Sequence, residues 1–208
     1  SSTWEAITVD DSNNVSITNS EILDSSYGIY VYDNSANLEV SGNTIQGNNA
    51  AAISLSSATD TGARIVNNMI DQNAGIGITG TIQDGVISNN IIKDSNNDGI
   101  QIYNISNTII SNNYIYSNVG DGMDISGSSN MIITENVIYD NSAIGINLAT
   151  VDNSTIEANN IGNAGSTGDE GIYLSSSDYN NIINNYITDA GCTFTCDGIY
   201  IDSISSVG

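Results

Sequence analysis

The sequence predicts an all-β solenoid made of short stacked coils, and three observations lead to this prediction. An opening Gly-Ile-x-Ile pattern recurs along the 208 residues at intervals of 22 to 27, a period typical of solenoids. Apolar residues fill four columns of the repeat, and an asparagine recurs at one position. The repeats begin at Ala6, Gly28, Ala52, Gly75, Gly99, Gly122, Gly145, Gly171 and Gly198.

The apolar columns predict short strands. Column one holds Ile7, Ile29, Ile53, Ile76, Ile100, Met123, Ile146, Ile172 and Ile199, and column two holds Val9, Val31, Leu55, Ile78, Ile102, Ile125, Leu148, Leu174 and Ile201. Column three holds Ile17, Val40, Ile65, Ile87, Ile110, Ile133, Ile156 and Ile182, and column four, five residues later, holds Ile22, Ile45, Ile70, Ile92, Ile115, Ile138, Ile161 and Ile187. Apolar positions two apart are a strand signal, and β-branched residues suit a pleated, half-buried surface.

The recurrent asparagine lies two residues before column four and predicts an asparagine ladder. Its members are Asn43, Asn68, Asn90, Asn113, Asn136, Asn159 and Asn185, with Ser20 in the first repeat. Asparagine tolerates the left-handed conformation of a sharp corner, so we expect each ladder residue to turn the chain. Stacked amides also hydrogen-bond from coil to coil, at roughly 1 kcal/mol net for each bond.

These patterns together favour a parallel β-helix of about eight coils of roughly 23 residues. Each coil has three short extended runs and must stack on its neighbours to close a core. The six-residue subrepeat of left-handed forms is absent, so we predict a right-handed helix. The alternative is a leucine-rich-repeat horseshoe, which would show leucine in most columns and a helical segment in each repeat. Residues 1–208 are expected to form one domain or a segment of a longer solenoid.

The pattern GIxI, a polar turn and I-x-N-N-x-I resembles the right-handed parallel β-helix repeats of the pectin-lyase-like superfamily. The resemblance runs from about Ala6 to Ile201. It implies the fold, but the superfamily includes pectate lyases, polygalacturonases, uronan epimerases, phage tailspikes and surface proteins without known chemistry. The fold therefore does not select one activity.

The charge of the chain excludes two classes of partner. The net charge is −22, and Arg64 and Lys93 are the two basic residues. Binding to phosphates needs clustered basic residues, so neither nucleic acid nor an anionic membrane surface is expected as a partner. No run approaches the ~18 apolar residues of a membrane-spanning helix, so membrane insertion is not expected.

The two cysteines and three glycosylation triplets indicate where in or outside the cell the protein is located. Cys192 and Cys196 are too few for a zinc site without histidine, so we predict a disulfide between them, which implies an extracellular or cell-surface protein. Asn14, Asn104 and Asn153 begin N-x-S/T triplets and are candidate glycosylation sites. In a chain rich in Asn and Ser, such triplets also arise by chance.

Outward positions of the first strand predict a glycan-binding face. Tyrosines there share a surface with carboxylates and amides, which gives flat apolar plates beside hydrogen-bonding groups. The candidate residues for a neutral glycan are Tyr30, Tyr32, Tyr103, Asp124, Tyr173 and Tyr200. Alternatively, tyrosine is there only because it favours strands. A second outward stripe indicates a lateral contact, or scattered strand-forming residues: Met69, Ile91, Tyr114, Val137 and Tyr186.

A group of carboxylates could bind calcium. Asp98 and Asp121 each precede a repeat glycine, and Asp124 follows closely. Ca²⁺ prefers six or more oxygen ligands, which stacked carboxylates could supply. Asp-Gly is also ordinary turn chemistry, and solvation alone can carry the repulsion between such charges. No cofactor is therefore required, although calcium is possible.

The same carboxylates are the only basis for catalysis. Acid and base carboxylates on neighbouring coils could hydrolyse a glycosidic bond. However, the chain lacks histidine and has almost no Arg or Lys, and a polyanion repels uronate polymers. We therefore predict that the protein is not an enzyme.

The sequence favours an extracellular structural or adhesive rod of a cell-surface or filament protein. Such a rod is expected to self-associate end to end or laterally. The alternative is a carbohydrate-binding or carbohydrate-active β-helix that uses the Tyr/Asp face for a neutral glycan.

Overall fold

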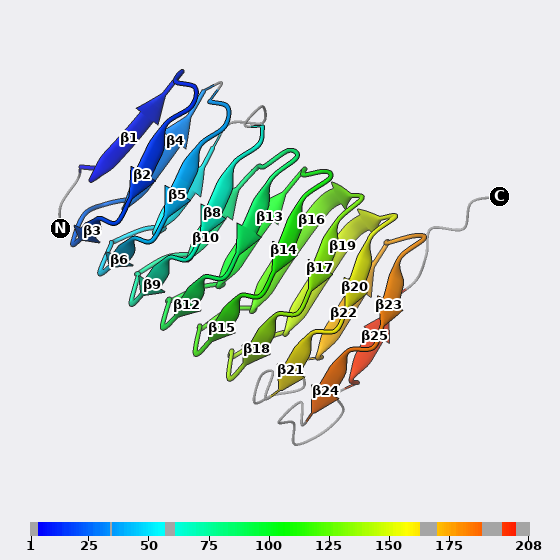
Figure 1. Ribbon diagram of the computed structural model, residues 1–208. Helices are drawn as coiled ribbons and strands as arrows, with labels where there is room; N and C mark the ends of the chain where they lie inside the picture. Colours follow the sequence, from blue (N-terminus) through cyan, green and yellow to red (C-terminus); the bar gives the residue numbers. More distant parts are fainter. Residues whose placement is uncertain (1–3, 34, 57–60, 163–169, 189–196, 203–208) are drawn as a thin grey trace.

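The computed structural model describes residues 4–33, 35–56, 61–162, 170–188 and 197–202, and they form a stack of coils (Figure 1). Every regular element within these ranges is a β-strand. The strands form three parallel sheets, which we name sheets A, B and C. The predicted parallel β-helix is confirmed. The horseshoe is excluded for this part of the chain, because no repeat here contains a helical segment.

Each of the first eight coils contributes one strand to each sheet, and β25 of the ninth coil adds a further strand to sheet A. Sheet A contains β1 (Ile7–Asp10), β4 (Ile29–Tyr32), β7 (Ile53–Leu55), β10 (Ile78–Gly80), β13 (Ile100–Tyr103), β16 (Met123–Ser129), β19 (Ile146–Asp152), β22 (Ile172–Ser175) and β25 (Ile199–Ile201). Sheet B contains β2 (Ser16–Thr18), β5 (Glu39–Ser41), β8 (Arg64–Val66), β11 (Val86–Ser88), β14 (Ile109–Ser111), β17 (Ile132–Thr134), β20 (Thr155–Glu157) and β23 (Asn181–Ile183). Sheet C contains β3 (Glu21–Leu23), β6 (Thr44–Gln46), β9 (Met69–Asp71), β12 (Ile91–Lys93), β15 (Tyr114–Tyr116), β18 (Val137–Tyr139), β21 (Asn160–Gly162) and β24 (Tyr186–Thr188).

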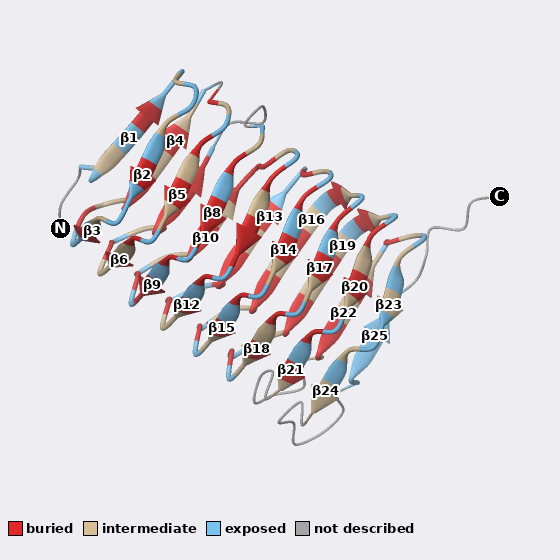
Figure 2. Ribbon diagram, in the orientation of Figure 1, coloured by how far each residue is buried: buried red, intermediate tan, exposed pale blue. Residues whose placement is uncertain are grey.

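The core is a column of aliphatic side chains enclosed by the three sheets. Successive strands pair in register, so that Ile115 of sheet C lies opposite Ile138 of the next coil. Both side chains are fully buried, and Figure 2 shows buried positions alternating with exposed ones along the strands. Burial of each such side chain contributes about 1.5–3 kcal/mol. The apolar columns therefore stabilise the stack coil by coil.

One coil departs from the predicted alignment. The sequence placed Ile76 in column one and Ile78 in column two, but strand pairing puts Ile78 in column one and Gly80 in column two. The pattern was ambiguous because Gly-Ile occurs twice in succession, from Gly75 to Ile78. Gly77 is the true repeat glycine, since a Cβ added there would lie 2.5 Å from the carbonyl oxygen of the next repeat glycine.

The predicted asparagine ladder is confirmed at the corner between sheets B and C. The Asn113 Oδ1 accepts hydrogen bonds from both the backbone N–H and the Nδ2 of Asn90, each at 3.0 Å. The Asn113 Nδ2 donates to the Ile87 carbonyl at 2.9 Å and to the Asn136 Oδ1 at 3.0 Å. The six ladder asparagines before Asn185 are no more than 2% exposed. Each buried amide is thus satisfied by the neighbouring coils.

The ladder residues do not turn the chain, contrary to expectation. The left-handed conformation belongs to the residue immediately before each of them, with φ between 50° and 67°. These residues are Asn19, Gly42, Asn67, Asn89, Asn112, Glu135, Ala158 and Asn184. The preceding residue makes the corner, so the ladder side chain can point inward to bond with the next coil.

A second ladder follows sheet C and was not predicted. It occupies the position three residues after column four, at Ser25, Asn48, Asn73, Ser95, Asn118 and Asn141. The backbone N–H and Nδ2 of Asn118 both donate to the Asn141 Oδ1, at 3.1 and 2.9 Å. Ser95 interrupts the series, and its buried hydroxyl has no hydrogen-bond partner within the described ranges.

Candidate functional site

The outward residues in the middle of the sheet A strands form one row that runs along the stack. Strand pairing places the following residues in register: Thr8, Tyr30, Ser54, Thr79, Gln101, Asp124, Asn147, Tyr173 and Tyr200. Neighbouring members are one strand spacing apart, about 4.8 Å. The predicted Tyr/Asp face is therefore a single continuous surface.

Tyrosines gather at the β4 end of this row. The ring centroid of Tyr30 lies 5.0 Å from that of Tyr27 and 5.6 Å from that of Tyr32. Tyr30 and Tyr32 line a pocket of about 410 Å³ together with Glu5 and Thr8. This volume is within the range of small-ligand sites. A pair of tilted rings and a carboxylate thus border one hollow.

A second tyrosine pair lies at the β22 end. The rings of Tyr173 and Tyr200 are stacked, with centroids 5.5 Å apart and an interplanar angle of 6°. The Tyr173 hydroxyl donates a hydrogen bond to the Asp202 Oδ2 at 3.3 Å. Burial and the neighbouring Asp202 raise the pKa of Tyr173, so the hydroxyl keeps its proton at neutral pH. The pair is a flat plate with a polar edge.

The structure does not bring all the predicted tyrosines together. Six strand steps separate β4 from β22 in sheet A, which corresponds to roughly 29 Å at one strand spacing per step. Tyr103 lies between these ends, at the end of β13, and its side chain is exposed. The face therefore has two tyrosine platforms with a polar region between them.

This polar region is a chain of hydrogen-bonded carboxylates and amides. The Gln101 Nε2 donates to the Asp98 Oδ2 at 3.0 Å and to the Asp124 Oδ2 at 3.2 Å. The Asn147 Nδ2 donates to the Asp124 Oδ1 at 3.3 Å and to the Asp121 Oδ2 at 3.1 Å. We name these five residues the carboxylate–amide chain. Its amide hydrogens neutralise part of the repulsion between three carboxylates.

Burial shifts the acidity of two of these carboxylates. Burial, together with the nearby charges of Asp98 and Asp124, raises the pKa of Asp121 to about 6. Hydrogen bonds from Asn147 and from the Ile144 N–H oppose this shift. The pKa of Asp98 is also raised, chiefly by burial. With a pKa of about 6, the Asp121 carboxyl group can exchange a proton with a ligand at mildly acidic pH.

The structure gathers the three candidate calcium ligands but separates them with amide donors. Asp98, Asp121 and Asp124 all belong to the carboxylate–amide chain, where N–H groups occupy the oxygens that a cation would need. Among the described residues, no group of three or more acidic, His or Cys side chains is arranged to hold a metal ion. This arrangement suits hydrogen bonding better than cation binding.

Two amides of the site, Gln101 and Asn147, were missing from the predicted set. The sequence placed both on the outward face of sheet A, but it did not show that they would link carboxylates of neighbouring coils. The Asn147 Oδ1 is buried and accepts no hydrogen bond within the described part of the chain. Because this oxygen is enclosed, it is an unsatisfied group of the folded chain and not an accessible acceptor.

The remaining predicted sites are surface features. Asn14, Asn104 and Asn153 are exposed and adopt left-handed conformations, with φ of 58°, 54° and 52°. Their glycosylation stays a prediction. Cys192 and Cys196 lie outside the described residues. Within the described ranges, no helix is long and apolar enough to cross a membrane.

A family model described as "right handed beta helix region" matches residues 1–70 and 74–207. No curated protein sequence matches the chain significantly. The fold is similar to several solved structures. The periplasmic alginate epimerase AlgG has a TM-score of 0.78 and 17% identity, and the match covers 88% of this chain and 47% of AlgG. The chain therefore spans about half the length of that protein.

Two further structures extend the comparison. One is PfbA, a surface adhesin of Streptococcus pneumoniae, with a TM-score of 0.72, 17% identity, and coverage of 92% of this chain and 58% of PfbA. The other is the enzymatically active domain of tailspike protein 2 from bacteriophage CBA120, with a TM-score of 0.68 and 14% identity. That match covers 84% of this chain and 32% of the tailspike chain.

These comparisons correct the prediction that the chain is not an enzyme. The structures that share its fold include an alginate epimerase and an enzymatically active tailspike domain. The prediction relied on the absence of histidine and the scarcity of basic residues. Carboxyl groups alone can perform acid–base chemistry on a glycan, so the lack of histidine does not exclude catalysis.

Proposed function

The chain belongs to the right-handed β-helix family, and on that premise we propose that it is a carbohydrate-active β-helix that binds a neutral glycan along sheet A. The observation that carries the proposal is the order of groups on this face. Two tyrosine platforms, at Tyr30 and at Tyr173, flank the carboxylate–amide chain on one in-register surface. Flat rings supply stacking area, and the amides and carboxylates supply hydrogen-bond partners.

The charge of the protein selects a neutral glycan over a uronate. With a net charge of −22, the surface repels polyanions. The centre of the face contains Asp98, Asp121 and Asp124 without a basic residue beside them in the carboxylate–amide chain. Each carboxylate oxygen has a second lone pair, so a neutral sugar can still donate its hydroxyl hydrogens to these oxygens.

Asp121 and Asp124 are the groups that we propose for catalysis. With a pKa of about 6, Asp121 can carry a proton at mildly acidic pH and transfer it to a glycosidic oxygen. The Asn147 Nδ2 bonds oxygens of both carboxylates, at 3.1 and 3.3 Å. A retaining glycosidase pairs such an acid with a carboxylate nucleophile, and we assign the role of nucleophile to Asp124.

The similar structures support an extracytoplasmic location. AlgG is periplasmic, and PfbA is a surface adhesin. We propose that this chain likewise works in the envelope or outside the cell, where polysaccharides are accessible. Adhesion is a second candidate function, favoured by the likeness to PfbA. It would use the same face, and end-to-end or lateral self-association stays a prediction.

The proposal is tested by calorimetric titration with neutral hexasaccharides of β-glucan, mannan and galactan, with an alginate hexasaccharide for comparison. We expect a neutral hexasaccharide to bind and Tyr173→Ala to weaken binding about tenfold, because loss of one stacked ring costs about 1.4 kcal/mol. Tyr179→Asn is the matched control. Tyr179 is 84% exposed and has a left-handed φ of 57° that asparagine tolerates.

Catalysis is tested by mass spectrometry of the same sugars incubated between pH 4 and pH 8. Shorter products that form below about pH 6, and that are lost with Asp121→Asn or Asp124→Asn, support the assigned roles. Binding without products supports adhesion. Binding that is equally strong in Tyr30→Ala, Tyr173→Ala and wild-type protein contradicts the sheet A site.

A further inference from the structure

Sheet C carries an outward row that is interrupted at one position. Strand pairing places these residues in register: Gln46, Asp71, Lys93, Tyr116, Tyr139, Gly162 and Thr188. Most of them have large side chains, but Gly162 has none. The row therefore has a gap one strand wide, with Tyr139 on one side and Thr188 on the other.

Three tyrosines form a fixed wall on one side of this gap. The rings of Tyr116 and Tyr139 are stacked, with centroids 5.0 Å apart and an interplanar angle of 8°. Tyr114 meets both rings edge to face, at 5.2 and 5.3 Å. Partial burial and a hydrogen bond with Tyr114 raise the pKa of Tyr139. These contacts hold the Tyr139 ring in place before any ligand arrives.

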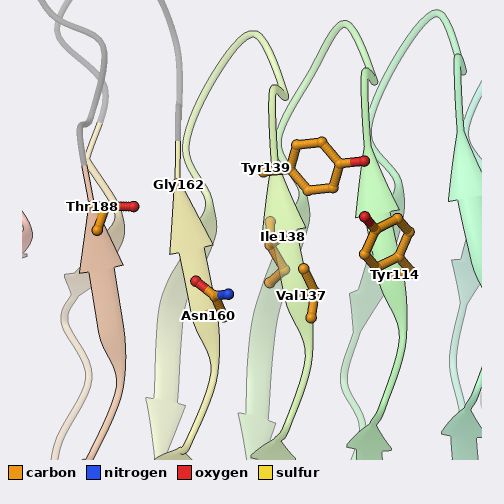
Figure 3. Close-up of a pocket in the computed structure, with 7 residues that line it drawn as sticks. All are labelled: Tyr114, Val137, Ile138, Tyr139, Asn160, Gly162 and Thr188. Atoms are coloured by element: carbon orange, nitrogen blue, oxygen red, sulfur yellow. The ribbon is translucent and has the colours of Figure 1, made fainter.

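The gap is a pocket of about 290 Å³ (Figure 3). Its lining residues are Tyr114, Val137, Ile138, Tyr139, Asn160, Gly162 and Thr188. In Figure 3 the Tyr139 ring leans toward Tyr114, so no side chain covers Gly162. The Thr188 hydroxyl points into this space, because a Cβ added to Gly162 would lie 3.0 Å from the Thr188 Oγ1.

We propose that this pocket is a second carbohydrate subsite, which takes one neutral sugar ring. The tyrosine wall offers an apolar plate, and the Asn160 amide and the Thr188 hydroxyl offer hydrogen-bond partners around the open floor at Gly162. None of the lining residues carries a formal charge at neutral pH, so the pocket supplies no counter-ion for a charged ligand. Its volume is near the lower end of the range for small-ligand sites, about 300 Å³, which suits a single ring.

The pocket fits a sugar better than the flat lateral contact that the outward stripe of sheet C suggests. A protein interface core is closely packed and apolar. Here the stripe runs from Met69 and Ile91 through Tyr114 and Val137 to Asn160 and Tyr186, so a polar amide interrupts it. The hollow lies at this interruption. It belongs to sheet C, whereas the carboxylate–amide chain belongs to sheet A.

The choice of a neutral sugar rests on the proposed function, so the experiment separates the two sites. ¹⁵N-labelled protein is titrated with the neutral β-glucan, mannan and galactan hexasaccharides, and amide shifts are followed by NMR. We expect shifts at the Gly162 backbone N–H and the Asn160 side-chain amide, with saturation in the millimolar range. Gly162→Val is expected to abolish these shifts, because the valine side chain fills the gap. The fold should tolerate this side chain, since the same row already contains Tyr116 and Tyr139.

Matched variants distinguish the outcomes. Gly162→Val should keep the wild-type melting temperature, since valine favours strands. Asn160→Ala provides a second test that leaves the shape of the pocket open, and it should weaken binding at least threefold. Tyr173→Ala, on sheet A, should leave the shifts at Gly162 unchanged.

Each pattern of shifts decides between the two proposals. Shifts that are confined to sheet A and persist in Gly162→Val overturn the second subsite and keep the proposed function. Shifts that are confined to Gly162 and Asn160 keep the subsite and overturn the sheet A site. No shift with any hexasaccharide at 20 mM overturns both. Line broadening over all of sheet C without added sugar would identify a lateral contact with a second copy and overturn the subsite.

Discussion

Two chains of hydrogen-bonded side chains run along the same solenoid, and they differ in composition and in environment. The ladder at the corner between sheets B and C repeats one residue type, and its interior members are buried and fully paired. The carboxylate–amide chain on sheet A mixes Asp, Gln and Asn. It leaves the Asn147 Oδ1 without a donor and Asp121 with a raised pKa.

The difference separates a structural role from a chemical one. An asparagine has both a donor and an acceptor, so identical amides stacked at a constant spacing satisfy one another. Carboxylates only accept hydrogen bonds when ionised, so a chain containing three of them needs donors between them or protons on them. The uniform ladder stabilises the fold, whereas the mixed chain retains a carboxyl group with a raised pKa, on which the proposed function relies.

Breaking the uniform ladder should have the largest effect. Asn113→Ala removes the acceptor used by two Asn90 donors and the donor used by the Ile87 carbonyl. Leaving these buried groups unpaired should lower the free energy of unfolding by about 3–5 kcal/mol, measured by urea denaturation. The control is Ser111→Ala, at the end of the strand before the same corner. An equal change in both variants would contradict the role of the ladder.

Removing charge from the mixed chain should have a smaller, pH-dependent effect. The pKa of Asp121 is about 6 in the folded state, against 3.8 for an unperturbed Asp. The folded state therefore binds a proton more readily, and this contribution to stability is lost as pH rises through 6. Lowering the pH from 7 to 5 should therefore increase the contribution of Asp121 to the free energy of unfolding by about 1 kcal/mol.

Asp121→Asn tests this contribution. Because the other carboxylates also titrate, the relevant quantity is the difference between wild type and variant, measured by urea denaturation at both pH values. The variant should show a smaller gain in stability on acidification. Asp152→Asn, at the end of β19, is the matched control. Identical pH dependence in Asp121→Asn and wild type would show that Asp121 has an ordinary pKa.

Completing the interrupted ladder should increase stability. Ser95 is fully buried, and its hydroxyl is unpaired among the described residues. Asp94 before it has the left-handed φ of 54° that the corner requires. Ser95→Asn should supply an acceptor to Asn73 and donors to the next coil, and so raise the free energy of unfolding by about 1 kcal/mol. A lower melting temperature would mean that the larger side chain does not fit.

The smallest effect is expected at a corner of the complete ladder. Ala158 has a φ of 53°, a conformation that costs an L-residue with a Cβ roughly 1–2 kcal/mol and glycine almost nothing. Glycine also increases the conformational entropy of the unfolded chain, which offsets part of this gain. The Ala158→Gly variant should therefore be more stable than the wild type by about 0.5 kcal/mol. Ala149→Gly, within β19 and without a left-handed φ, should be destabilised. Destabilisation of both variants would contradict strain at Ala158.

Most of the fold could be predicted because it repeats. Nine occurrences of one pattern fixed the strands, the inward columns and the first ladder. The repeat also produced the error at Gly75, where two consecutive Gly-Ile pairs fit the pattern equally well and only the pairing of Ile78 with Ile100 decides between them. The second ladder is weaker in sequence because serine replaces asparagine at Ser25 and Ser95.

The candidate site was predictable only in part. The alternation of inward and outward positions identified the outward tyrosines and acids of sheet A. It did not show which of them lie next to one another, because the outward residue types differ from coil to coil. Gln101 and Asn147 gain their role only from lying on either side of Asp124. The gap at Gly162 likewise depends on what precedes and follows it in the neighbouring coils, which are about 23 residues away in sequence.

Because the coils stack in constant register, the distance between two points on the solenoid depends only on the number of coils between them. Each added repeat moves everything beyond it by one strand spacing, about 4.8 Å, without altering either end. Duplicating the repeat that begins at Gly122 would lengthen the interval between the Tyr30 and Tyr173 platforms by a single step. If the proposed glycan binds both platforms, the number of coils between them sets the length of polymer that is needed.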